Sequence, residues 1–384
     1  MFPTLGDLFS YLFNTTVKIN VPTFGAFMAL AFCGAYVVFV SEFKRKERNG
    51  TIKGFEITEV HSNTGLALEI FLNTLPAFLL GYKVRIFLSA LFHGGDAAEA
   101  FLSLKGSWVT GLLVAVVWAV WVYLDRRKGQ HKTGSVVRHY IHPYQLMPHI
   151  VFSVAVWGLI GAKLFDAIEH IQELQHEPLW VLLSRGGFAY YGGLMFGALS
   201  YLYIGYRRNI PLIHMADIGS PGMMLAYGIG RIGCQLAGDG DWGIINRNIK
   251  PGWVPQWLWS SAYPHNAINA GHYIPGCLSQ HCSVLPYGVY PTPLYEAIGC
   301  ILLFGCLWFL RTRIKKPGQL FFTFLLLNGA ERFLVELIRI TPRYHVLDML
   351  LSQAQMIALL FMLGGVAGFA VQAYRKHVFS PLSV

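Results

Sequence analysis

The chain contains 384 residues, of which 54% are hydrophobic and only 13% are charged. Soluble globular proteins carry about 25% charged residues, so this composition excludes a soluble protein and indicates an integral membrane protein. Lys and Arg outnumber Asp and Glu by 30 to 20, which gives a net charge of +10. Aromatic residues make up 15% of the chain, as expected where side chains anchor at two membrane interfaces.

Nine segments are apolar over the roughly 20 residues that a membrane-spanning helix needs. In chain order they are residues 20–40, 65–84, 107–124, 146–166, 187–205, 215–237, 291–310, 319–338 and 354–374. The pattern predicts an all-α polytopic membrane protein with about nine transmembrane helices, all within a single transmembrane domain of residues 1–384. Segment 65–84 has the weakest pattern, because Glu69 and Asn73 interrupt it.

The distribution of Lys and Arg predicts the orientation of these helices, since cytoplasmic loops retain positive charge. Eighteen cations lie in the C-terminal tail and in the alternate loops 41–64, 125–145, 206–214 and 311–316, whereas nine lie on the other side, which includes the long loop 238–290. We therefore predict the N-terminus outside, the C-terminus in the cytoplasm and loop 238–290 in the periplasm. Because the cations do not form one exposed face, nucleic acid is excluded as a partner.

The remaining three cations, Lys163, Arg231 and Arg332, lie inside predicted spans, where ionisable residues mark functional sites. The predicted orientation places all three near the outer ends of their helices, with Arg185 at a similar depth. Arg339, by contrast, is counted among the nine cations of the outer surface. Guanidinium groups bind phosphate bidentately, so this cluster of cations predicts a site for a phospholipid headgroup.

Structural ion pairing is the alternative interpretation of the two buried arginines. Arg332 is followed one helical turn later by Glu336, at the spacing of an intrahelical ion pair. The candidate partners of Arg231 are Asp217, Asp239 and Asp241. Two arginines at matched depth on separate spans favour the phosphate interpretation.

Two other patterns bear on ligand binding. Glycine is frequent in residues 185–193 and 219–243, which lets helices or a lipid approach the backbone closely. The G-x-G-x-x-G spacing of residues 228–233 lies in an apolar span and does not follow a strand, so it does not indicate a dinucleotide site. Cys277 and Cys282 lie in the outer loop, where a disulfide or free thiols are favoured over a zinc site.

Residues 230–243, Gly-Arg-Ile-Gly-Cys-Gln-Leu-Ala-Gly-Asp-Gly-Asp-Trp-Gly, resemble the G-R-[IL]-G-N-F-x-N-G-E-x-x-G signature of the bacterial prolipoprotein diacylglyceryl transferases. Further matches to this family follow in its order at residues 185–193, 216–221, 290–296 and 328–339. The resemblance covers about residues 20–40 and 146–375. It implies a core of seven helices, so residues 65–124 are expected to form an inserted helical hairpin.

The resemblance also implies an activity. The enzyme would transfer the diacylglyceryl group of phosphatidylglycerol to the lipobox cysteine thiol of a preprolipoprotein, forming a thioether and releasing glycerol phosphate, without a metal or a cofactor. Its partners would be phosphatidylglycerol, signal peptides with a lipobox cysteine, and the lipid bilayer. The implied location is the bacterial cytoplasmic (inner) membrane, with the active site facing the periplasm. A transporter or flippase of an anionic lipid or solute is the alternative function.

The family motifs imply roles for individual residues. The two essential arginines of the family correspond to Arg231 and Arg332, which are expected to hold the lipid phosphate. Asp239 and Glu336 fall on acidic motif positions and are expected to orient the arginines. Tyr191 stands where the family has a histidine, its proposed general base, and is expected to carry the thiol proton. The other residues expected to bind phosphatidylglycerol are Phe24, Lys163, Arg185, Gly192, Gly193 and Gly238.

Overall fold

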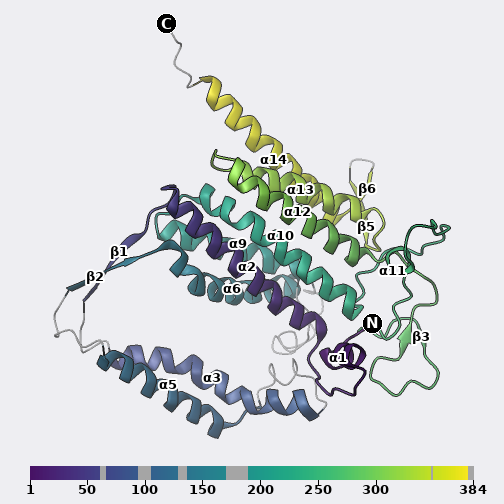
Figure 1. The fold of residues 1–384 in the computed structure, drawn as a ribbon, viewed down its shortest axis with the longest axis horizontal. Coiled ribbons are helices and arrows are strands. Elements are labelled where there is room, and N and C mark those ends of the chain that lie inside the picture. The colour runs from purple at the N-terminus through teal and green to yellow at the C-terminus, as the bar shows by residue number, and fades with distance from the viewer. Residues whose placement is uncertain (61–65, 94–104, 129–135, 170–188, 347–348, 379–384) are drawn as a thin grey trace.

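The computed structural model describes residues 1–60, 66–93, 105–128, 136–169, 189–346 and 349–378, and most of them lie in long helices (Figure 1). The long helices are α2 (Thr23–Arg48), α3 (Leu66–His93), α5 (Trp108–Lys128), α6 (Met147–Glu169), α9 (Tyr190–Arg207), α10 (Leu212–Ala237), α12 (Thr292–Arg313), α13 (Gln319–Glu336) and α14 (Gln353–Val378). Shorter helical segments are α1 (Leu5–Phe13), η2 (Pro143–Leu146) and α11 (Gln256–Trp259). Each predicted span falls largely on one of the long helices.

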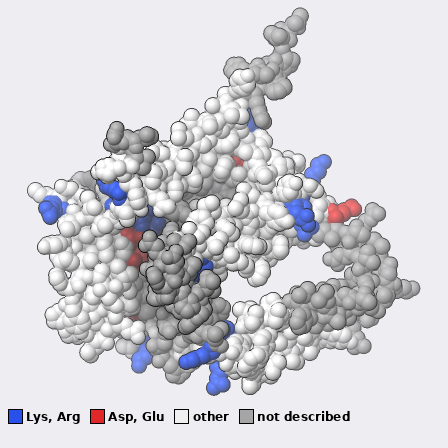
Figure 2. Space-filling view, turned by 180° about the vertical axis from the view of Figure 1, so that it is seen from behind, with Lys and Arg blue, Asp and Glu red and all other residues white. Residues whose placement is uncertain are grey.

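The structure thus shows a mostly helical membrane protein. Within the described part of the chain, four segments are long and apolar enough to cross a membrane: Thr23–Arg48, Pro143–Ile168, Thr292–Arg313 and Gln353–Tyr374. One face of the molecule is largely uncharged, with Lys and Arg scattered over it (Figure 2). Exposed aliphatic side chains such as Val37 and Leu302, at 66% and 68% exposure, are consistent with contact to lipid. The total of nine spans and the orientation of the termini stay predictions.

Helix α10 lies at the centre of the bundle, where it packs against α2 on one side and α12 and α13 on the other. Helix α10 ends at Ala237 because Gly238 adopts the left-handed conformation, with φ 67°, and donates its N–H to the Cys234 carbonyl, the usual end of a helix at glycine. The two acidic residues that follow, Asp239 and Asp241, therefore leave the helix axis directly beyond Arg231.

Asp217 fixes the opposite end of α10. Its carboxylate accepts hydrogen bonds from the backbone N–H groups of Gly318 and Phe321 at 2.9 and 3.1 Å and from Lys46 Nζ at 3.1 Å. It thereby satisfies free N–H groups at the start of α13 and joins that helix to α2 and α10. Pairing of Asp217 with Arg231, one of the alternatives considered from the sequence, is therefore wrong.

Helices α3 and α5 pack against each other and stand apart from the other helices (Figure 1). A two-stranded antiparallel ribbon joins them to the bundle, formed by β1 (Phe55–Val60) and β2 (Val136–Ile141) with Phe55 opposite Ile141. This ribbon was not predicted from the sequence, since its two strands are brought together from positions about 80 residues apart in the chain.

Two further small sheets lie between predicted spans, in segments for which no strands were predicted. Strand β3 (His272–Tyr273) pairs with β4 (Ser283–Val284) in the long loop after α10, and β5 (Arg343–Val346) pairs with β6 (Met349–Ser352) before α14. Cys277 and Cys282 form a disulfide between β3 and β4, which excludes their thiolates as zinc ligands. The all-α prediction is therefore correct for the bundle and incomplete for its loops.

Candidate active site

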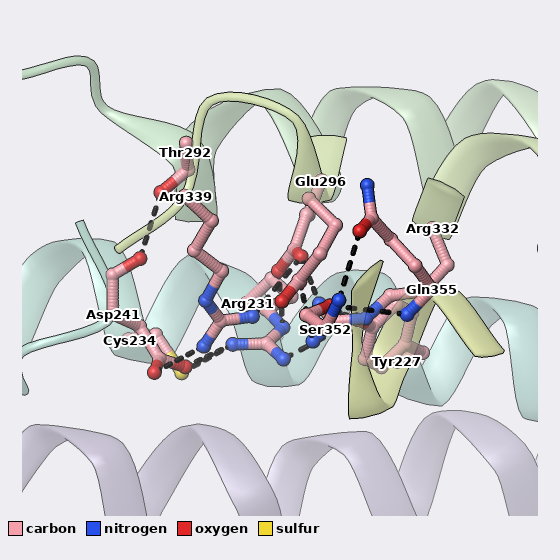
Figure 3. A network of polar contacts seen from close by, with 11 residues as sticks. Tyr227, Arg231, Cys234, Asp241, Thr292, Glu296, Arg332, Arg339, Ser352 and Gln355 are labelled. Carbon is pink, nitrogen blue, oxygen red and sulfur yellow. Dashed lines mark hydrogen bonds and ion pairs between the residues drawn. The ribbon is translucent and has the colours of Figure 1, made fainter. Parts of the chain in front are cut away.

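Three arginines converge on two carboxylates where α10, α12 and α13 come together (Figure 3). Arg231 comes from the last two turns of α10, Arg332 from the last turns of α13, and Arg339 from the segment just after α13. Glu296 from the first turns of α12 and Asp241 from the loop after α10 lie among them. Residues up to about 110 positions apart in the chain thus form one buried charged network.

Glu296 is the central carboxylate of this network and is only 1% exposed. Its Oε2 lies 2.6 Å from Arg231 Nε, and its Oε1 accepts a hydrogen bond from Arg332 Nη1. The same Oε1 lies 3.4 Å from Arg339 Nη1. Oε2 and Arg231 Nε form an ion pair, but the Nε–H does not point at Oε2 as it would in a hydrogen bond. One carboxylate therefore bridges both arginines that the sequence singled out.

Asp241 neutralises the other side of the network. Its two oxygens contact Arg231 Nη1 and Arg339 Nη2, and its backbone carbonyl accepts a hydrogen bond from Thr292 Oγ1 at 2.7 Å. Burial alone would raise the pKa of Asp241, but Arg231 and Arg339 together lower it. Asp241 thus stays ionised and balances part of the positive charge of Arg231 and Arg339.

The arginines also form ion pairs that were considered from the sequence as the alternative to phosphate binding. These pairs exist alongside the shared contacts with Glu296. Arg332 Nη2 lies 3.2 Å from Glu336 Oε2 one turn along α13, and Arg231 pairs with Asp241. Tyr227 links both arginines as well, because its hydroxyl oxygen accepts from Arg231 Nη2 at 3.2 Å and from Arg332 Nη1 at 3.3 Å. Paired arginines held in this way are preorganised for an anion.

Asp239, which was expected to orient the arginines, forms no ion pair with them among the described contacts. Its Oδ1 accepts a hydrogen bond from the Asp241 backbone N–H at 3.4 Å. Burial and the neighbouring Asp241 carboxylate raise the pKa of Asp239 above its usual 3.8. Of the acidic residues weighed as partners of Arg231, Asp241 rather than Asp239 makes the ion pair.

The raised pKa of Asp239 predicts a pH-dependent effect of Asp239→Asn on stability. An acid whose pKa is higher in the folded state than in the unfolded state costs stability above its folded pKa, and the cost vanishes below about 3.8, where both states are protonated. We expect Asp239→Asn to raise the thermal unfolding midpoint in detergent at pH 7 and to have no effect below about pH 3.8. A lower midpoint at pH 7 would contradict this prediction.

One group of side chains has the composition of a metal site. The Cys234 sulfur and carboxylate oxygens of Asp239 and Asp241 lie within 4.8 Å of one another. Both carboxylate oxygens of Asp241 already contact guanidinium groups. The positive charge of these groups disfavours a metal cation at the same place. We therefore assign no metal to this cluster, and the expectation that the reaction needs none stays a prediction.

The remaining predicted site residues occupy different surroundings. Phe24 in the first turn of α2 packs beside Gly233, since a Cβ on Gly233 would lie 3.5 Å from Phe24 Cα. Gly192 faces Gly161 of α6, and a Cβ on Gly192 would lie 2.3 Å from the Gly161 carbonyl oxygen. A Cβ on Gly193 would likewise lie 3.3 Å from the Gly158 carbonyl oxygen. Close packing of α6 and α9 therefore explains the glycines at both positions.

The backbone conformation explains the glycine at position 238, because this residue takes a positive φ and ends α10. Lys163 lies in α6, a helix that packs chiefly against α9. Arg185 lies outside the described residues, and of Tyr191 only the backbone, in the first turn of α9, is described.

Four members of the network were not predicted as site residues, namely Tyr227, Asp241, Glu296 and Arg339. Arg339 was placed on the outer surface by the charge count, and this placement is wrong, since Arg339 is 8% exposed and pairs with Asp241 and Glu296. A signal for two of them was present, because Glu296 and Arg339 end the two downstream segments that resemble family motifs. The count failed for Arg339 because it assigned every residue outside a span to the surface.

The fold and the cluster define a helical membrane protein with a largely buried network of arginines and carboxylates where α10, α12 and α13 meet. Residues 101–371 match the family model described as prolipoprotein diacylglyceryl transferase, and the chain belongs to this family. The match includes α5 and all elements of the charged network and begins after α2.

Curated relatives agree with this assignment. The chain is similar to the phosphatidylglycerol–prolipoprotein diacylglyceryl transferase of Clostridium tetani (strain Massachusetts / E88), with 31% identity over 59% of this chain and 82% of the relative. The enzyme of the same name from Staphylococcus carnosus (strain TM300) is 29% identical over 67% and 80% of the two chains. That from Actinobacillus pleuropneumoniae serotype 3 (strain JL03) is 27% identical over 69% and 89%. The family predicted from the sequence motifs is thus confirmed.

Proposed function

We propose that the protein transfers the diacylglyceryl group of phosphatidylglycerol to the lipobox cysteine of preprolipoproteins, forming a thioether and releasing glycerol phosphate. The observation that carries this proposal is the convergence of Arg231 and Arg332 on one carboxylate and one hydroxyl, in a chain of the diacylglyceryl transferase family. The relatives' names specify both phosphatidylglycerol and prolipoprotein.

The two arginines suit the chemistry of this transfer. The cysteine thiolate attacks the glyceryl C3 carbon, the bond from that carbon to the phosphate oxygen breaks, and the oxygen leaves with its electron pair on glycerol phosphate. The negative charge on the phosphate grows during this step. Fixed guanidinium groups in a site shielded from water stabilise such charge better than mobile ones, so Arg231 and Arg332 are assigned to the phosphate.

The thiol must lose a proton, since the thiolate is the nucleophile. We assign this proton transfer to Tyr191 at the start of α9. Glu336 orients Arg332 through their 3.2 Å ion pair, while Asp239 acts on Arg231 through the adjacent Asp241. Phe24, Lys163, Arg185, Gly192, Gly193 and Gly238 complete the proposed contacts with phosphatidylglycerol.

The location and topology follow from the same proposal. The protein lies in the bacterial cytoplasmic membrane as one transmembrane domain of about nine helices, with its N-terminus and the arginine cluster on the periplasmic side. We also propose that residues 65–124 are an inserted hairpin, of which residues 94–104 lie outside the described residues. The separation of α3 and α5 from the bundle supports this proposal, whereas the family match already includes α5. The substrate peptide is the signal peptide that carries the lipobox cysteine.

Mass spectrometry tests the proposed activity. Purified protein is incubated with phosphatidylglycerol and a lipobox peptide, and the peptide is expected to gain the mass of one diacylglyceryl group, while a peptide with serine in place of the cysteine gains none. If a folded preparation adds no mass but moves anionic lipid between the leaflets of vesicles, the protein is a transporter and the proposal is wrong.

A further inference from the structure

In the structure, Glu296 occupies the position between Arg231 and Arg332 in which the proposed function requires a phosphate. Its two oxygens face the two guanidinium groups separately, Oε2 toward Arg231 at 2.6 Å and Oε1 toward Arg332. A phosphodiester also presents two non-bridging oxygens, and guanidinium groups bind both kinds of anion in the same way. Glu296 therefore mimics the ligand that the arginines are expected to hold.

The network has no surplus positive charge with which to accept a further anion. Three arginines, Arg231, Arg332 and Arg339, are balanced by three carboxylates, Asp241, Glu296 and Glu336, in the described ion pairs.

A further carboxyl group, Glu331, lies where α12 meets α13, with its Cγ 3.4 Å from the position that a Cβ on Gly299 would take. Both Glu331 oxygens are buried and have no hydrogen-bond partner among the described residues. Burial without a partner favours the neutral form of Glu331, so this group adds no charge to the count. A phosphate added beside the ionised Glu296 would still place two negative charges together in a site with little solvent, which is unfavourable.

Glu296 also has a third cation within reach. Its Oε1 lies 3.4 Å from Arg339 Nη1, and its Oε2 lacks an aligned hydrogen bond to Arg231. A small rotation of the side chain away from Arg231 and Arg332 would therefore leave the carboxylate beside Arg339, still paired. Arg339 is buried and already held by Asp241, so it is fixed in place to receive Glu296.

We propose, on the basis of the proposed function, that Glu296 is an internal counter-ion that holds the phosphate position in the ligand-free enzyme, and that the lipid phosphate enters by displacing it toward Arg339. Glu296 is on this account a positioning residue that sets phosphate affinity. It keeps two buried guanidinium groups paired between turnovers, and by competing with the product phosphate it speeds product release.

The test compares the binding of glycerol phosphate to the purified full-length protein and to Glu296→Gln by isothermal titration in detergent. Glutamine keeps the size of the side chain and removes the competing charge, so glycerol phosphate is expected to bind about tenfold tighter. In the transfer assay the same variant is expected to show a lower KM for phosphatidylglycerol and a lower kcat, because the product leaves more slowly.

Glu42→Gln is the matched control. Glu42 is likewise buried and pairs with two arginines, Arg45 and Arg311, but at the opposite end of α2 from the site. We expect Glu42→Gln to leave glycerol phosphate affinity unchanged. If Glu296→Gln does not fold, Glu296→Asp is measured in its place. The shorter aspartate side chain cannot reach both guanidinium groups, so this variant should also bind glycerol phosphate more tightly.

The outcomes separate the inference from the proposed function. If the wild-type protein transfers diacylglyceryl groups but the folded Glu296 variants bind glycerol phosphate no tighter or more weakly, Glu296 only scaffolds the arginines and the inference is wrong. If the wild-type protein neither transfers diacylglyceryl groups nor binds glycerol phosphate, the proposed function itself fails.

Discussion

Alanine at position 231 or at position 332 is expected to reduce diacylglyceryl transfer by about 10²- to 10³-fold or more, the loss typical of removing one preorganised donor to a developing anion. Each arginine contacts Glu296 and Tyr227 from a separate helix, so neither can replace the other in geometry. The measurement is the rate of diacylglyceryl transfer to a lipobox peptide at saturating phosphatidylglycerol.

The variants Arg231→Lys and Arg332→Lys separate charge from geometry. Lysine retains the positive charge but lacks the planar fork that pairs with two oxygens, so a large loss is expected here too. Arg247→Ala, in an exposed part of the long loop after α10, serves as the control and should retain near-normal activity. Near-normal turnover in either alanine variant at position 231 or 332 would refute the phosphate assignment.

Arg339→Ala is expected to lower both stability and activity, although the residue lies outside the predicted spans. Its guanidinium pairs with Asp241 and lies 3.4 Å from Glu296 in a buried position. Asp241 and Glu296 both keep Arg231 as a partner after this change, and the Asp241 side chain is 34% exposed. The expected cost is therefore that of a lost charged hydrogen bond, about 1.5–3 kcal/mol. The free energy of unfolding in a fixed detergent, measured by denaturant titration, tests the effect on stability.

Arg343→Ala is the matched control for this prediction. Arg343 lies four residues further along the same segment but is exposed, and its described hydrogen bond is to the Leu337 carbonyl. Surface changes of this kind usually alter stability by less than about 0.5 kcal/mol. Equal effects of Arg339→Ala and Arg343→Ala on stability would show that the buried network contributes nothing specific.

The positions of the helices could be predicted from the sequence because their signal is local. Each predicted span is a mostly apolar segment of the chain, and the structure places a helix over most of each. The ribbon of β1 and β2 could not be predicted in this way, since it depends on pairing between distant segments that carry no such pattern.

In the candidate site, too, residues with a local sequence signal could be predicted and residues that depend on distant contacts could not. Arg231 and Arg332 were identified because a charge inside an apolar span is costly and therefore conspicuous. Glu296 lies at the start of α12 and Arg339 just beyond α13, where a charged residue is ordinary. Their importance arises from the meeting of three helix ends, and sequence spacing does not report which residues meet there. The motif segments contained both residues but did not distinguish them from their neighbours.

The central claim is that Arg231 and Arg332 together hold the phosphate of the lipid substrate. Titration of glycerol phosphate into the wild-type protein and into the Arg231→Ala, Arg332→Ala and Arg247→Ala variants tests it most directly. The predicted result is saturable binding to the wild-type protein and to Arg247→Ala, with at least about 100-fold weaker binding to the other two variants, as expected for a lost charge-assisted contact. Equal affinity in all four proteins would contradict the claim.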